Sequence, residues 1–179
     1  MADLKGLKVA VLATDGFEES ELTEPMKALQ QAGATVTIVS LKPGEIQGFK
    51  HHEKSVRIAV DAALSTVKPD QFDAVVLPGG TLNADALRSV PEVQQFLKAM
   101  SAKPMAVICH APWELVSAGL AKGRTMTAYH TIQDDVRNAG ARFEDQEVVV
   151  DGNLITSRQP SDLPAFNREM LRVFGQSRR

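Results

Sequence analysis

The feature that most constrains this chain is the regular alternation of short apolar segments with longer segments of helical periodicity. Continuously apolar runs such as "KVAVLAT" (8–14) and "FDAVVLPGG" (72–80) are typical of strands buried on both faces of a sheet. Between such runs apolar residues recur at helical spacing, as Leu22, Met26 and Leu29 do, which predicts a helix ending near Gly33. Strands that alternate with helices predict a mostly parallel α/β sheet with helices on both faces.

The remaining elements follow the same rhythm within a single domain spanning 1–179. Pro25 is expected to kink the first helix or to mark its true start. Ser89 and Glu92 are spaced as a capping box ahead of a helix over 93–100, and a closing helix is expected over 163–174. Further strands are expected at 35–41, 103–110 and 124–129, with hairpins at 43–61 and 147–157, the latter adding antiparallel edge strands.

Charge and cysteine content narrow the class of protein. Twenty basic and 22 acidic residues give a formal net charge of -2, whereas a nucleic-acid binder normally carries a basic excess. The one cysteine cannot form an intrachain disulfide, so nothing points to an oxidising compartment. The apolar run near the N-terminus is too short for a signal peptide or a membrane span. We therefore expect a cytoplasmic protein that binds neither nucleic acid nor membrane.

Three segments that carry candidate chemistry are expected to meet at one edge of the sheet. The acidic turn "TDGFEE" (14–19), the glycine pair in "LPGG" (77–80) and "CHAP" (109–112) each follow a predicted parallel strand. Ligands bind outside the carboxyl ends of the strands in such sheets. Cys109 lies directly between a strand and a helix, a corner that strains the backbone and presents the side chain, and the helix amides should lower the thiol pKa. The amides of Gly79 and Gly80 could hold an oxyanion.

Other interpretations of these residues stay open on position alone. A free cysteine at a strand end is often simply a buried packing residue, and Glu18 could be an acid favoured in the first turn of a helix. The run His51, His52 and Glu53 resembles a metal cluster, but adjacent strand residues point to opposite faces, so we expect a solvated hairpin and no metal. The acidic turn lacks the G-x-G-x-x-G spacing, and no cofactor is expected.

Several segments together resemble the PfpI family of the class I glutamine amidotransferase-like superfamily. They are "LPGG", "AVICHAPWELVSAGLAKGR" and "DDVRNAGARFEDQEVVVDGNLITSRQPSDLPAFNREML", and the likeness runs from Lys8 to about Phe174. The resemblance implies a three-layer flavodoxin-like sandwich that usually assembles as a homodimer.

The resemblance also implies roles for individual residues. Cys109 matches the nucleophilic elbow cysteine and His110 its neighbouring histidine, while Glu18 matches a glutamate whose protonated carboxyl group hydrogen-bonds the sulfur. Asp85 stands near the place of an acid that protease-like members supply to the histidine across a subunit contact, although the loop here is one residue longer. The oxyanion or pocket residues implied are Gly79, Gly80, Ala111 and His130.

Three functions fit these residues. The leading one is a stress-associated hydrolase or lyase that uses Cys109 on reactive carbonyls or on carbonyl-damaged, glycated protein groups. The alternatives are an intracellular cysteine peptidase and a non-enzymatic redox sensor or chaperone that works through oxidation of Cys109. A glutamine amidotransferase proper is disfavoured, because the sequence contains no downstream H-x-E.

Overall fold

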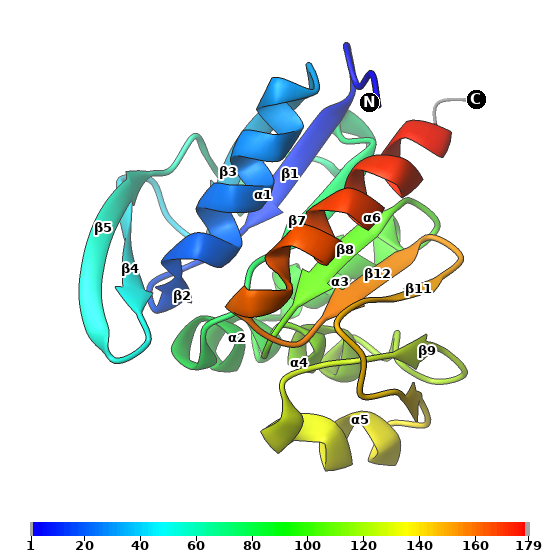
Figure 1. The fold of residues 1–179 in the computed structure, drawn as a ribbon. Coiled ribbons are helices and arrows are strands. Elements are labelled where there is room, and N and C mark those ends of the chain that lie inside the picture. The colour runs from blue at the N-terminus through cyan, green and yellow to red at the C-terminus, as the bar shows by residue number, and fades with distance from the viewer. Residues whose placement is uncertain (1, 178–179) are drawn as a thin grey trace.

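A computed structural model describes residues 2–177 of the chain. A central sheet of seven strands has the order β11-β12-β8-β7-β1-β3-β6 (Figure 1). Every neighbouring pair in it is parallel except β11 and β12, which form the antiparallel edge. The strands of this sheet are β1 (Lys8–Leu12), β3 (Thr35–Ser40), β6 (Ala62–Ala63), β7 (Ala74–Leu77), β8 (Met105–Ile108), β11 (Val149–Asp151) and β12 (Leu154–Ser157).

Helices cover both faces of the sheet, so the predicted α/β sandwich is confirmed. On one face α1 packs beside α6 over a core that includes Leu22 and Phe166 (Figure 1). The opposite face is covered mainly by α2, α3 and α4, whose core includes Leu97 and Leu115. The helices are α1 (Glu19–Gln31), α2 (Thr81–Arg88), α3 (Pro91–Met100), α4 (Pro112–Ser117), α5 (Gln133–Asn138) and α6 (Leu163–Gln176), with 3-10 turns η1 (Leu64–Thr66), η2 (Pro69–Gln71), η3 (His130–Ile132) and η4 (Pro160–Asp162).

The predicted hairpin over 43–61 is present but belongs to a separate sheet. Strands β4 (Glu45–Lys50) and β5 (Glu53–Ala59) pair antiparallel, and β2 (Phe17–Glu18) pairs parallel with β4. This three-stranded sheet stands beside the main one, and its turn lies at the same end of the molecule as α2 (Figure 1). It therefore reaches the edge where the candidate site is expected.

Three local predictions need correction. Pro25 does not mark the start of α1, which begins at Glu19 and continues through Pro25 with its apolar face packed against the sheet. The capping box does not form, since α3 starts at Pro91 and the Ser89 hydroxyl donates back to the Ala86 carbonyl at 3.2 Å. The strand expected at 124–129 is shortened to β9 (Thr125–Met126), which pairs with β10 (Arg142–Phe143) outside the main sheet.

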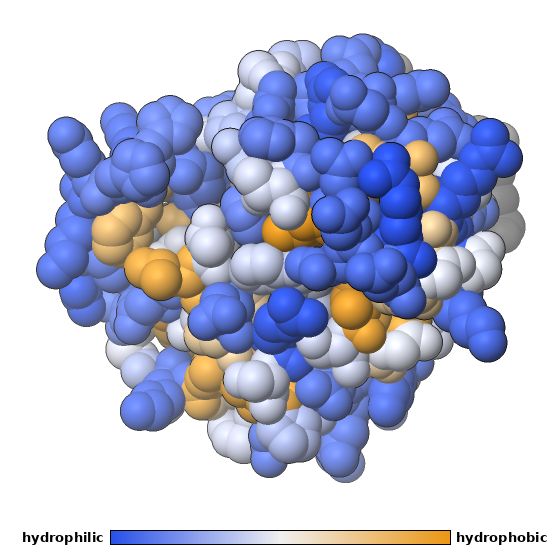
Figure 2. All heavy atoms as spheres, turned by 90° about the horizontal axis from the view of Figure 1, so that it is seen from below, coloured by the Kyte–Doolittle hydropathy of each residue, from blue (hydrophilic) through white to orange (hydrophobic). Residues whose placement is uncertain are grey.

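The topology brings three connections together. Strands β1, β7 and β8 are parallel, with β7 between the other two, so the segments that follow them leave the sheet at the same edge. Figure 2 views the molecule from that end, where hydrophobic residues form separate patches among hydrophilic ones. Among the described helices, none combines the length and the apolar character that a membrane crossing requires.

Candidate active site

Cys109 occupies a strained corner between β8 and α4, as predicted. Its φ angle is 67°, in the left-handed region that residues with a Cβ rarely adopt. Backbone hydrogen bonds hold the corner: Cys109 N–H donates to the Ser157 carbonyl at 2.9 Å, and the Cys109 carbonyl accepts from Tyr129 N–H at 2.8 Å. The residue is only 7% exposed, yet it lines a cleft. The elbow therefore presents the sulfur to the cleft on a fixed backbone.

The carboxyl group beside the sulfur belongs to Glu21 in the first turn of α1. Glu21 is fully buried, and its Oε1 accepts a hydrogen bond from Gly79 N–H at 3.0 Å. The Cys109 thiol lies within hydrogen-bonding reach of the same carboxyl group. Gly79 is required at this contact, because a Cβ there would collide with both Glu21 and Cys109. One glycine thus lets the carboxyl group and the elbow approach each other.

The assignment of Glu18 to the sulfur is therefore corrected. Both Glu18 carboxylate oxygens accept the backbone N–H of His51, at 3.1 and 3.2 Å. Glu18 ends β2, which pairs with β4, so its side chain is directed toward the turn of the β4–β5 hairpin. Glu18 lines the same cleft as Cys109, but the hydrogen-bonding carboxyl group expected at the sulfur is supplied three residues further along.

Burial controls the protonation of this pair. Desolvation, and next the nearby negative charge of Glu18, raise the pKa of Glu21 from 4.5 to about 8, although the Gly79 hydrogen bond opposes the shift. Glu21 is therefore mostly protonated at neutral pH. Burial also raises the pKa of the Cys109 thiol, and an ionised Glu21 raises it further. The expectation of a lowered thiol pKa was wrong, because the elbow is buried as well as flanked by amides.

His110 lies against the sulfur despite being its neighbour in sequence. The ring Nδ1 is 3.3 Å from Cys109 Sγ, and Nε2 is 3.4 Å from Thr81 Oγ1. The Tyr129 ring stacks on the imidazole with centroids 4.8 Å apart, which fixes its orientation. Burial, and secondarily His130, lower the pKa of His110, so the ring is neutral at pH 7. With its proton on Nε2, His110 can accept the thiol proton at Nδ1.

The backbone donors differ from those expected. The N–H groups of Gly80 and His110 are directed at the sulfur and favour its thiolate form. Gly79 N–H is already used by Glu21, and Ala111 N–H by the Ile108 carbonyl at 3.1 Å. Of the predicted oxyanion donors, only Gly80 therefore directs its amide at the reacting atom, and Ala111 is a fully buried packing residue.

Asp85 and His130 lie outside the immediate surroundings of the sulfur. Asp85 is exposed on α2, and within residues 2–177 the polar partners of the His110 ring are Cys109 and Thr81 alone. His130 is exposed and stacks on Tyr129 with centroids 4.6 Å apart. A Cys–His–acid triad is not completed within these residues.

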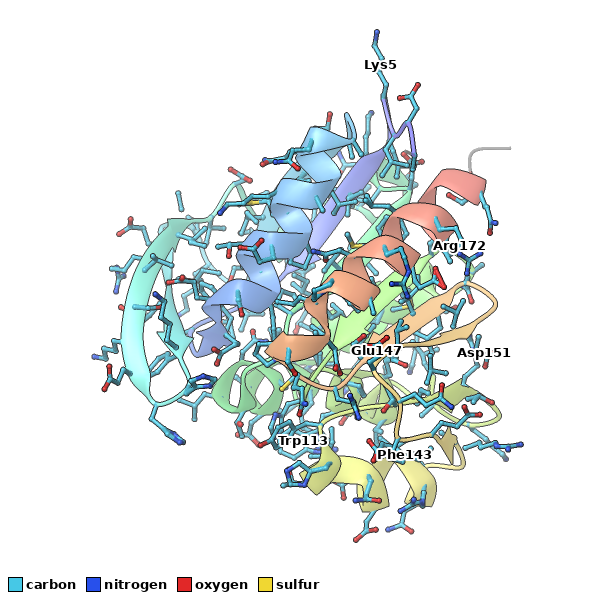
Figure 3. All side chains as sticks on the ribbon, in the orientation of Figure 1. Lys5, Trp113, Phe143, Glu147, Asp151 and Arg172 are labelled. Atoms are coloured by element: carbon cyan, nitrogen blue, oxygen red, sulfur yellow. The ribbon has the colours of Figure 1, made fainter. Side chains whose placement is uncertain are left out.

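Trp113 lies at the α4–α5 end of the molecule, far from Lys5 at the opposite end (Figure 3). Its indole N–H donates to Asp135 at 2.7 Å, and its ring meets His110 edge-on with centroids 5.2 Å apart. The Trp113 side chain therefore packs against the imidazole and is not part of the cleft lining.

The cleft that contains Cys109 has a volume of about 1030 Å³. Its lining comes from all three converging connections and from the hairpin turn, including His51 and His52. Both histidines stand in the turn between β4 and β5 and contribute to the lining of the cleft, so the alternation of side chains along a strand does not apply to them. In residues 2–177, no three His, Cys, Asp or Glu side chains are grouped to hold a metal ion.

Glu21 was missed by the sequence analysis, although the sequence carries a signal for it. Four acids crowd the start of α1, at positions 18, 19, 21 and 24. Only Glu21 lies on the buried stripe of the helix with Leu22, Pro25 and Leu29. An acid on an apolar helical face beside a predicted elbow is the unusual one, and it marks the functional carboxyl group.

Comparison with known proteins shows which family the chain belongs to. The DJ-1/PfpI family model matches residues 7–173. The chain is 47% identical to Protein/nucleic acid deglycase 2 of Escherichia coli, covering 94% of this chain and 98% of that protein. It is 44% identical to the Putative cysteine protease YraA of Bacillus subtilis, covering 93% and 97% of the two. The crystal structure of Drosophila melanogaster DJ-1beta superposes with a TM-score of 0.84 at 31% identity, over 96% of this chain and 89% of that one. The chain belongs to the DJ-1/PfpI family.

Proposed function

We propose that the protein is a cysteine-dependent enzyme that acts on reactive carbonyls or on carbonyl-damaged, glycated protein groups. The observation that carries the proposal is one sulfur on a strained elbow, placed between a neutral imidazole and a protonated carboxyl group. Thiols add readily to carbonyl carbons as thiolates. A buried protonated acid beside the sulfur can stabilise the negative charge of the thiolate by donating a hydrogen bond to it. The likeness to a protein named as a deglycase supports the same substrate class.

The geometry suggests the order of proton movements. His110 Nδ1 accepts the Cys109 thiol proton, leaving a thiolate that the Glu21 O–H and the amide of Gly80 stabilise. The sulfur then adds to the carbonyl carbon: one S–C bond forms, and the π electrons move to oxygen. The imidazolium returns its proton to that oxygen, which gives a neutral hemithioacetal. Because the thiol pKa is raised, the thiolate forms during the reaction and is not stored in the free enzyme.

Peptide hydrolysis is the weaker alternative. The likeness to a protein named as a putative cysteine protease supports it. A peptidase needs an imidazolium that is oriented and stabilised through the reaction, usually by a carboxylate, and the described chain supplies His110 with Thr81 Oγ1 in that position. We retain the peptidase as a proposal that depends on an acid such as Asp85 reaching His110 from a second subunit of a homodimer.

A redox role for Cys109 is the other alternative. Peroxide would convert the thiolate to a sulfenate and water, and a protonated Glu21 would hydrogen-bond the new oxygen. The chain has no second cysteine to resolve this state as an intrachain disulfide. Mass spectrometry after mild peroxide would show Cys109 gaining one or two oxygens, and an unmodified sulfur would end this alternative.

The decisive experiment follows the release of unmodified arginine from methylglyoxal-modified arginine. Cys109→Ser and Cys109→Ala should both lose turnover by at least about 1000-fold, because the nucleophile is removed. Arg57→Ala, on the far part of the hairpin, is a matched control for handling and folding. Turnover by Cys109→Ala at the wild-type rate would contradict the proposal.

The cellular setting is proposed with the activity. We infer a cytoplasmic, stress-associated protein that works as a homodimer, because carbonyl damage arises in the reducing interior where a free thiol persists. Sedimentation of the purified protein tests the dimer. Growth of a deletion strain in methylglyoxal tests the stress role, with Cys109→Ala as the complementation control.

A further inference from the structure

The turn of the β4–β5 hairpin has an unusual backbone. His51 and His52 connect Lys50 to its partner Glu53, and the φ angle of His51 is 58°. A two-residue hairpin turn with positive φ at its first position is normally filled by glycine. Of the residues 2–177, only His51 and Cys109 combine a side chain with positive φ. Strain of this kind persists only where surrounding contacts hold it, and it concentrates at functional sites.

Glu18 provides the contact that holds this turn. Its two carboxylate oxygens share the backbone N–H of His51, and its Oε2 lies 3.9 Å from His51 Nδ1. A second charge pair flanks it, with Lys50 Nζ 3.8 Å from Glu19 Oε2. The Glu18 side chain is only 13% exposed, so water competes weakly for its oxygens.

The turn also forms part of the wall of the cleft. Phe49, His51 and His52 line the same cavity as Cys109. They belong to the small sheet β2-β4-β5 and not to the central sheet that carries the elbow. The turn is therefore held to the acidic segment by side-chain contacts as well as by the pairing of β2 with β4.

We propose that Glu18 is a positioning residue whose carboxylate holds the strained hairpin turn, so that Phe49, His51 and His52 form a fixed wall for substrates larger than a free aldehyde. A small carbonyl reacting at Cys109 does not need this wall. An adduct carried on a peptide extends beyond the sulfur and contacts it. The part of this inference that concerns the conformation of the turn does not depend on the proposed function. The part that concerns peptide substrates rests on the proposed function.

Two substitutions separate the hydrogen bond from the charge. Glu18→Gln and Glu18→Ala both remove the negative charge and so affect Glu21 alike, but only Glu18→Ala removes the acceptor for His51 N–H. We expect the His51 amide to exchange its hydrogen at least about tenfold faster in Glu18→Ala than in Glu18→Gln, measured by NMR. Glu18→Asp, which keeps the charge but shortens the reach, should behave like Glu18→Ala. Equal exchange in all three variants would overturn the proposal.

The catalytic consequence is a split between substrates. With a peptide that carries methylglyoxal-modified arginine, Glu18→Ala should raise KM about fivefold to tenfold relative to Glu18→Gln, while the two variants handle free methylglyoxal equally. Adding His51→Gly to Glu18→Ala removes the backbone strain and should restore most of the KM, with His51→Gly alone as the control for the lost imidazole. A KM change that is the same for both substrates would contradict a wall. Absence of turnover in the wild type would end the proposed function but leave the exchange result standing.

Discussion

Two buried glutamates make an instructive comparison, because both have a raised pKa but only one of them lies at the cleft. Glu21 lies on α1, on one face of the sheet, and Glu114 lies on α4, on the other. Both are fully buried, and desolvation is the main reason that the pKa of each is raised. Glu21 has the Gly79 amide, the Cys109 thiol and a place in the cleft lining. Within residues 2–177, neither oxygen of Glu114 has a hydrogen-bond partner, whereas at Glu21 only Oε2 lacks one.

The difference shows that a raised pKa does not by itself mark a functional carboxyl group. Burial alone raises the pKa of Glu114, and a buried acid without a partner only weakens the fold. Glu21 is equally buried, but its proton faces a reactive atom that substrates can reach. The functional assignment depends on the partners of a buried acid and on access to the cleft.

The largest effect is expected from replacing Glu21 with an apolar residue. Glu21→Leu should slow turnover and Cys109 alkylation by about 10-fold to 100-fold, because the negatively charged sulfur loses the hydrogen bond that the Glu21 carboxyl group donates. Glu21→Gln should lose less, since its amide can still accept from Gly79 and donate to sulfur. Glu114→Leu is the matched control and should change either rate less than about twofold. Equal losses at the two positions would remove the distinction between them.

The next effect concerns stability. Glu114→Leu should raise the free energy of unfolding at pH 8 by about 1–3 kcal/mol, because a buried carboxyl group without partners is replaced by hydrocarbon of similar size. Urea unfolding monitored by circular dichroism measures the change. A destabilised Glu114→Leu would mean that Glu114 has a stabilising partner.

A smaller effect is expected in the pH dependence of stability. The pKa of Glu21 is about 8 in the folded protein and 4.5 as its ordinary value, so the folded state binds more protons between these limits. The contribution of Glu21 is therefore full below about pH 4.5 and is lost as the pH rises through about 8. Burial also raises the pKa of Glu114, so its contribution to the free energy of unfolding is likewise lost as the pH rises. Unfolding free energies measured from pH 5 to 9 should fall less steeply in Glu21→Gln and in Glu114→Gln, and an unchanged slope in both would contradict burial as the cause.

The smallest effect is expected at Asp85. Asp85→Asn should alter turnover less than about twofold, because the residue is exposed and charge contacts at an exposed position are weak. Turnover measured above and below the concentration at which a dimer dissociates provides the check. A loss of tenfold or more, seen only in the dimer, would establish Asp85 as an acid acting across the subunit contact.

The sequence predicted the sheet, its helices and the elbow because those features depend on local patterns. Continuous apolar runs identify β1, β7 and β8, and the absence of a loop before Pro112 predicts the strain at Cys109. Glu18 was misassigned because the pairing of β2 with β4 directs its side chain to the hairpin turn, which leaves Glu21 as the carboxyl group beside the sulfur. That direction depends on the pairing of Phe17 with Gly48, a contact between segments about 30 residues apart that no local pattern specifies.

The thiol pKa was misjudged for a related reason. Amides at the start of a helix can be expected from the sequence, and two amides do face the sulfur. The burial of the elbow beside Glu21 outweighs them, and burial is a property of the assembled site. The orientation of His110 likewise depends on Tyr129, which reaches the ring from a segment 19 residues further along.

The most direct test of the account is the titration of the Glu21 carboxyl group, followed by carbon-13 NMR of glutamate-labelled protein with Glu21→Gln to assign the signal. The account predicts a midpoint of about pH 8 that falls in Glu18→Gln, because that substitution removes the neighbouring charge. A midpoint near 4.5, unaffected by Glu18, would show that Glu21 is ionised at neutral pH and holds no proton for the sulfur.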